Sequence, residues 1–74
     1  MREILPHITV DPAIRLGKPV IAGTRVPVEL IVAKIAGGMT LEEVMTEYAL
    51  TREQVLATLQ YASHVLETET LLAA

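Results

Sequence analysis

The chain has 74 residues and contains no cysteine, phenylalanine or tryptophan, so it can form one small domain with an aliphatic core and with neither disulfides nor thiolate metal sites. Its net charge of −3 is unevenly placed: five basic and three acidic residues give +2 for residues 1–36, and one basic and six acidic residues give −5 for residues 37–74. The acidic second half repels a phosphate backbone, which argues against strong nucleic-acid binding by the chain alone.

Hydropathy and size set two further expectations. The N-terminus has no long apolar stretch, and the most apolar run, residues 26–36, is interrupted by Pro27, Glu29 and Lys34. We therefore expect a cytoplasmic protein that neither spans nor binds a membrane. A domain this small buries little surface by itself and has no disulfides to stabilise it, so we also expect a homodimer.

Two short β-strands are predicted near the N-terminus. The first covers residues 7–10 (HITV) and ends at the turn-forming pair Asp11-Pro12; the second covers residues 19–21 (PVI). Two short strands are not stable alone, so they require helices packed behind them or strands from a second subunit. We assign residues 1–25 to this segment of strands and loop.

A first helix is predicted from Val26. Thr24 is a candidate N-cap, Pro27 suits a first helical turn, and Gly37-Gly38 can supply the left-handed residue on which helices commonly end. The predicted buried stripe has helical spacing and consists of Val28, Ile31, Val32 and Ile35.

Two more helices are predicted, each beginning with a capping box. Thr40 precedes Glu43 by three residues, and Thr51 precedes Gln54 by three, so each pair can satisfy free backbone N–H groups. The predicted inward faces are Leu41, Val44, Met45 and Tyr48 in the second helix, and Val55, Leu59, Ala62 and Leu66 in the third.

The predicted fold is mainly α: a short N-terminal strand pair followed by a helix-turn-helix-like, homeodomain-like unit of three helices over residues 26–70. We expect residues 1–74 to be one domain that forms a dimer, with residues 71–74 as a frayed tail.

The stretch GKPVIAGTRVPVEL, residues 17–30, is rich in turn-forming and basic residues. Neither GxGxxG nor GxxxxGK[ST], the common phosphate-binding patterns, fits it. Its glycines, prolines and threonine can be explained by turns and a helix cap. Lys18 and Arg25 are not explained in this way, and they can bind phosphate or an acidic protein surface.

The order and spacing of several short motifs resemble a known family. They run from ITVDP through GKP, GTR and PV to the LEEV helix and the Leu50-Thr51 start of the third helix, within residues 8–62. On these motifs the chain resembles the bacterial and archaeal family of domain of unknown function 433 (DUF433). Leu16 departs from the family pattern, in which a small or polar residue is expected before Gly17.

The resemblance implies a small dimer with helix-turn-helix-like architecture that acts as a VapB-type antitoxin beside a PIN-like ribonuclease toxin. The active site of such a toxin is a cluster of metal-binding carboxylates, so an inserted guanidinium would compete with the metal. Arg25 is the first candidate for this contact, and Arg15 and Lys18 are the next.

DNA binding is the second role to consider. A recognition helix presents its first turns to base edges, and here Arg52 could read guanine and Gln54 adenine. Glu53 repels phosphate, and the third helix has no lysine. We therefore expect repression to depend mainly on a toxin complex. The alternative is a dimeric helix-turn-helix DNA-binding or scaffolding module that has no toxin partner.

No residue pattern in the sequence indicates catalysis. His7 and His64 are far apart and have no metal-ligand spacing, and Ser63 lies within a helix without a nucleophile elbow. The cluster Glu42, Glu43 and Glu47 is typical of a solvated helix start. We expect a protein that is not an enzyme and that needs neither a cofactor nor a metal ion.

Overall fold

A three-stranded antiparallel sheet lies at one end of the molecule in the computed structural model, which describes residues 1–69. The strands are β1 (Arg2–Leu5), β2 (Ile8–Val10) and β3 (Val20–Ile21), in the order β1-β2-β3. Ile8 of the central strand pairs with Leu5 on one side and Ile21 on the other. The sheet therefore includes both predicted strands.

Strand β1 was not predicted from the sequence. Its residues are REIL, and the two charged side chains at its start are exposed. An edge strand with one unpaired side tolerates such charges, but it lacks the alternation of apolar and polar residues that identifies a half-buried strand. The predicted strand pair is thus a three-stranded sheet.

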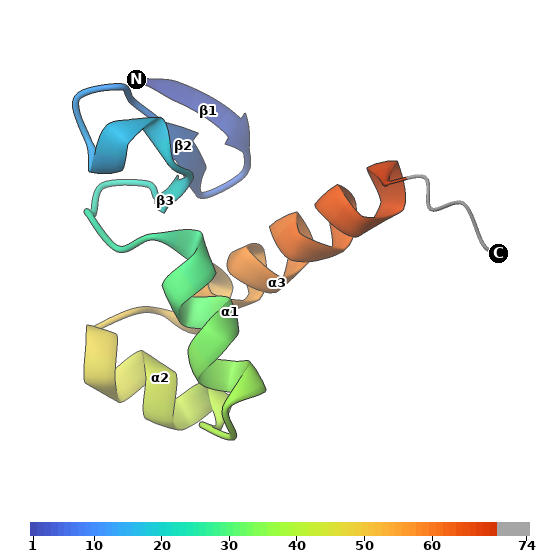
Figure 1. Ribbon diagram of the computed structural model, residues 1–74. Coiled ribbons are helices and arrows are strands. Elements are labelled where there is room, and N and C mark those ends of the chain that lie inside the picture. Colours follow the sequence, from blue (N-terminus) through green and yellow to red (C-terminus); the bar gives the residue numbers. More distant parts are fainter. Residues whose placement is uncertain (70–74) are drawn as a thin grey trace, which may run out of the picture.

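Three helices follow the sheet, as predicted: α1 (Val28–Ala36), α2 (Leu41–Tyr48) and α3 (Arg52–Thr68). Helix α1 runs from the sheet to the opposite end, α2 lies across that end, and α3 passes back beside α1 and extends beyond the rest of the fold (Figure 1). The predicted tail, residues 71–74, lies outside the described residues.

The predicted start of α1 is wrong. The helix begins at Val28 with Pro27 in the N-cap position, and Thr24 does not cap it. The Thr24 hydroxyl instead donates to the Ile21 carbonyl (2.7 Å) and accepts from the Val26 N–H (3.0 Å). Thr24 therefore closes the turn after β3. The predicted end is confirmed, because Gly38 has a left-handed φ of 108° just beyond the helix.

Both predicted capping boxes are present. The Thr40 N–H donates to the Glu43 carboxylate at 2.8 Å, and the Glu43 N–H donates to the Thr40 hydroxyl at 3.1 Å. Thr51 and Gln54 make the same pair of hydrogen bonds at 2.8 and 3.1 Å. These caps fix the starts of α2 and α3.

The buried side chains form two clusters that α1 connects. Ile31 of α1 belongs to the larger cluster, which lies among the three helices, and Val28 belongs to the smaller one, which lies against the sheet. The other buried members are Ile21, Val44, Leu50 and Val55 in the larger cluster, and Ile8 and Ala57 in the smaller.

The predicted stripe of α3 is correct only at its start. Val55 is fully buried, Leu59 and Ala62 are half-buried, and Leu66 is 66% exposed. The helical spacing was sound, but the second half of α3 extends past the elements that cover its first half (Figure 1). The apolar face therefore continues beyond the core.

None of the helices within residues 1–69 is long and apolar enough to cross a membrane.

Candidate partner-binding surface

The loop between β2 and β3 has an unusual backbone. The Asp11 carboxylate accepts from the Ala13 N–H at 2.9 Å and so begins a turn. Arg15, Leu16 and Gly17 then follow with φ values of 51°, 57° and 81°. The left-handed conformation costs a residue other than glycine about 1–2 kcal/mol. The Leu16 side chain is 95% exposed and so gains little from packing.

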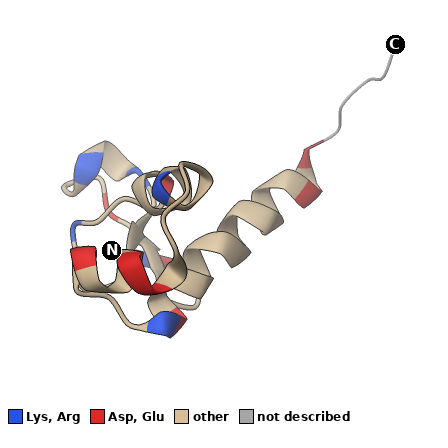
Figure 2. Ribbon diagram, turned by 90° about the horizontal axis from the view of Figure 1, so that it is seen from below, with Lys and Arg blue, Asp and Glu red and all other residues tan. Residues whose placement is uncertain are grey.

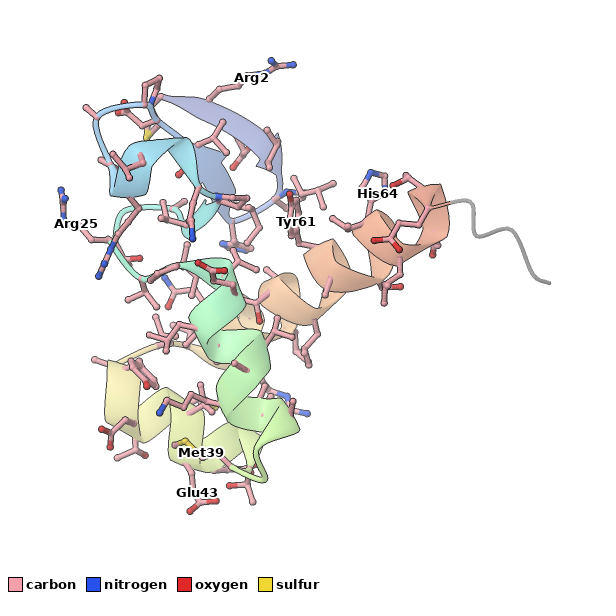
Figure 3. The ribbon with its side chains drawn as sticks, viewed as in Figure 1. Arg2, Arg25, Met39, Glu43, Tyr61 and His64 are labelled. Carbon is pink, nitrogen blue, oxygen red and sulfur yellow. The ribbon has the colours of Figure 1, made fainter. Side chains whose placement is uncertain are left out.

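This turn brings Arg15 next to Arg25, ten residues later in the chain. The Arg15 Nε–H donates to the Arg25 carbonyl at 3.1 Å, which joins the two loops on either side of β3. Both arginines are exposed, and neither forms a salt bridge within residues 1–69. Arg25 extends from the side of the molecule into solvent (Figure 3). Two of the three predicted partner-binding cations are thus neighbours with free donors.

Lys18, the third predicted cation, has a different environment. Its ammonium donates to the Glu29 carboxylate of α1 at 2.8 Å, and both side chains are largely exposed. The pair anchors the loop to the start of α1 and partly neutralises Lys18. Lys18 is therefore less available to an acidic partner than Arg15 and Arg25.

The predicted DNA-reading residues lie together on the first turn of α3. Arg52 is exposed and lies 3.9 Å from the Glu42 carboxylate of α2. The Gln54 side-chain oxygen is occupied by the cap, although its amide N–H groups can still donate. Helices α2 and α3 are joined by a three-residue turn in which Ala49 is left-handed. This is a helix-turn-helix arrangement.

Helix α2 carries three carboxylates, of which that of Glu42 lies 3.9 Å from Arg52. Glu42, Glu43 and Glu47 line a shallow depression on α2 together with Met39 and Thr46. The backbone N–H of Thr40, aided by its hydroxyl, holds the pKa of Glu43 below the ordinary value, so this carboxylate is strongly ionised at neutral pH. The charge beside α3 is therefore unfavourable for DNA phosphates.

The two histidines and the serine considered for catalysis lie in two different parts of the fold. His64 and Ser63 are exposed on α3, and His7 lies in the turn between β1 and β2. Within residues 1–69, no three histidine, aspartate or glutamate side chains gather where they could hold a metal ion.

Sequence reasoning missed an apolar groove between α1 and the second half of α3. It has a volume of about 600 Å³, and its walls include Val28 and Val32 of α1 and Val65 and Leu66 of α3. One sequence feature could have indicated it: residues 54–66 contain no charged side chain, which is unusual for an exposed part of a helix.

The family comparison agrees with the observed motifs. The family model "Protein of unknown function (DUF433)" matches residues 8–62, from β2 into α3. The chain belongs to the DUF433 family. The matched residues thus include both loop arginines, all of α2 and the first part of α3.

One solved structure similar to this DUF433 chain is the crystal structure of Rv2018 from Mycobacterium tuberculosis. The TM-score is 0.64 and the sequence identity is 29%, over 70% of this chain and 24% of that one. The DUF433 chain thus spans about a quarter of the Rv2018 chain. No curated protein matches this chain.

Proposed function

We propose that this chain is the antitoxin of a prokaryotic type II toxin-antitoxin system and neutralises a PIN-like ribonuclease by binding it directly. The observation that carries the proposal is the hydrogen bond from Arg15 to the Arg25 backbone, which holds two exposed cations close together in a protein whose net charge is negative. The likeness to VapB-type antitoxins, drawn from the family motifs, supplies the class of partner.

The mechanism follows from the chemistry of the two side chains. A guanidinium is always charged and offers several N–H donors in a fixed plane, which suits bidentate binding to carboxylates. In a nuclease whose carboxylates bind metal ions, Arg25 would occupy these carboxylates and displace the metal. Arg15 would add a second positive charge. Leu16, the residue that follows Arg15, would contact apolar surface at the rim of the toxin's active site.

In this proposal the chain is a binding protein of the cytoplasm and catalyses no reaction. Its partners are the toxin, a second copy of the chain and, mainly in the toxin complex, DNA. Arg52 and Gln54 would then read base edges while the toxin supplies phosphate contacts that compensate for the carboxylates of α2.

The experiment compares charge-neutral variants in a ribonuclease inhibition assay. The chain is co-expressed with the product of the adjacent gene, and inhibition of RNA cleavage is titrated for the wild type, Arg25→Ala and Arg15→Ala. Lys34→Ala is the matched control, because Lys34 is another exposed cation, near the far end of α1.

We expect Arg25→Ala to weaken inhibition by at least about tenfold, since buried arginine contacts are frequent hot spots. Arg15→Ala should have a smaller effect in the same direction, and Lys34→Ala should inhibit like the wild type. Circular dichroism confirms that each variant is folded. Equal inhibition by Arg25→Ala and wild type would refute the role of Arg25.

The alternative is a dimeric helix-turn-helix module that binds DNA or scaffolds a partner without any toxin. The helix-turn-helix arrangement of α2 and α3 favours it. This reading predicts specific DNA binding by the free protein that Arg52→Ala weakens and Arg25→Ala leaves unchanged. Arg52→Ala and Arg25→Ala therefore separate the two proposals.

A further inference from the structure

The groove between α1 and α3 is an apolar surface that the proposed toxin contact does not use. Arg15 and Arg25 do not line it. Its floor and walls come from Val28 and Val32 on one side and from Tyr61, Ala62, Val65 and Leu66 on the other. Lys18 lies at its edge with its ion-pair partner Glu29. The groove is thus apolar inside and charged at one rim.

The second half of α3 is uncharged and largely apolar, like the groove that it borders. The buried residues of this helix are Val55, Ala57 and Thr58, all in its first half. Beyond them the helix extends away from the body (Figure 1). Leu66, on this extended part, is 66% exposed. Figure 2 shows no charged residue on the extended part of α3 until the acidic residues near its end. An extended, uncharged and amphipathic helix normally packs against another element.

We propose that the groove binds the second half of α3 from a second copy of this chain. The two α3 helices would pack antiparallel about a two-fold axis, so each copy offers both an apolar helix and a groove that receives it. Such an interface is self-complementary, because the same helix forms one wall of the groove and the part that fills the partner's groove.

The size and shape of the groove suit this occupant. A volume of about 600 Å³ accommodates several aliphatic side chains from a helix. Ala62 lies in the groove wall, and a small residue there lets two helices approach closely. A two-fold axis forms every contact twice, so both grooves of the pair are filled together.

The charges at the two ends of the proposed contact also fit. In an antiparallel pair, the end of each α3 points toward the body of the other copy, where Lys18 borders the groove. The end of α3 carries the exposed Glu67 and Glu69, and neither forms a salt bridge within residues 1–69. Lys18 has three N–H donors, so it can bind a glutamate of the second copy while it keeps Glu29.

This proposal is tested without any toxin, by measuring the molar mass of the free protein. Light scattering after size-exclusion chromatography gives the mass of the wild type and of two variants that put a charge into opposite walls: Leu66→Glu and Ala33→Glu. Both replaced side chains are exposed in the single chain, so each variant can fold. Gln60→Glu is the matched control, because Gln60 is an exposed residue of the same helix that does not line the groove.

We expect the wild type and Gln60→Glu to be dimers at about 10 μM, and both groove variants to dissociate at least about tenfold more readily. Circular dichroism at the same concentration checks that the variants retain their helices. A monomeric wild type would overturn the proposal and leave the groove to a different protein partner. A dimer that Leu66→Glu and Ala33→Glu leave as stable as wild type would overturn it too, and would place the interface elsewhere.

Discussion

Ile31→Ala tests the packing of the larger core cluster. Ile31 is completely buried in the middle of α1 and belongs to the cluster formed by the three helices and β3. The substitution removes three carbon atoms, and at about 0.8 kcal/mol for each buried methylene the lost transfer energy is about 2.4 kcal/mol. The cavity that remains raises the cost, so we expect a loss of about 2–5 kcal/mol in unfolding free energy.

Leu59→Ala is the comparison, because Leu59 lies on α3 and belongs to neither buried cluster. Leu59 is half-buried, so its replacement by alanine loses about half of the transfer energy, roughly 1 kcal/mol, and leaves no closed cavity. For a domain of this size each kcal/mol lowers the melting temperature by about 4–8 °C. We therefore expect Ile31→Ala to melt at least about 8 °C below the wild type, and Leu59→Ala to melt at a temperature between the two.

The assay is thermal unfolding followed by circular dichroism. All three proteins are measured at one low concentration, because association raises the melting temperature by mass action. Equal melting temperatures for the two variants would refute the assignment of Ile31 to the centre of the core and Leu59 to its edge. A lower value for Leu59→Ala than for Ile31→Ala would show that α3, not α1, carries the principal contact.

Three further substitutions test local features. Leu16→Gly removes a left-handed leucine, so we expect an unfolding free energy up to about 1 kcal/mol higher together with weaker inhibition of the toxin; a variant that inhibits as well as the wild type would exclude a contact by the side chain. Thr51→Ala removes the α3 cap and should lower the unfolding free energy by about 1 kcal/mol, which urea titration measures. The lowered pKa of Glu43 stabilises the fold above the ordinary value of 4.5, and this contribution is lost as the pH falls through the lowered pKa. Glu43→Gln should therefore lose less stability on acidification than the wild type, and identical acid titrations would contradict the capping role.

Local sequence patterns predicted the helices well because their determinants are local. Each capping box needs only two residues three apart, and both boxes are present at Thr40 and Thr51. The inward face of α2 was likewise correct, with Val44 buried and its predicted neighbours packed against the core. The spacing of residues along a helix decides which side chains share one face, and this spacing can be counted directly from the sequence.

The sequence-based predictions failed where the structure of a segment depends on contacts with distant parts of the chain. Strand β1 exists because it pairs with β2, and its own residues have weak strand character. The exposure of Leu66 depends on where the elements that cover α3 end, which spacing along the helix cannot indicate.

The candidate site was predicted in part. The sequence singled out Arg15, Lys18 and Arg25 by charge, whereas the contact of Arg15 with Arg25 and the ion pair of Lys18 with Glu29 depend on how the loops fold. Charge can be counted from the sequence, but whether a cation has a partner depends on tertiary structure. The groove was missed for the same reason, because its two walls come from helices far apart in the chain.

The most direct test of the antitoxin proposal is the rate of RNA cleavage by the purified product of the adjacent gene, measured as the wild-type chain is added. The proposal predicts that cleavage falls steadily and stops once the two proteins are present in comparable amounts, with a stable complex recovered from the mixture. An unchanged cleavage rate in the presence of excess folded chain would contradict it.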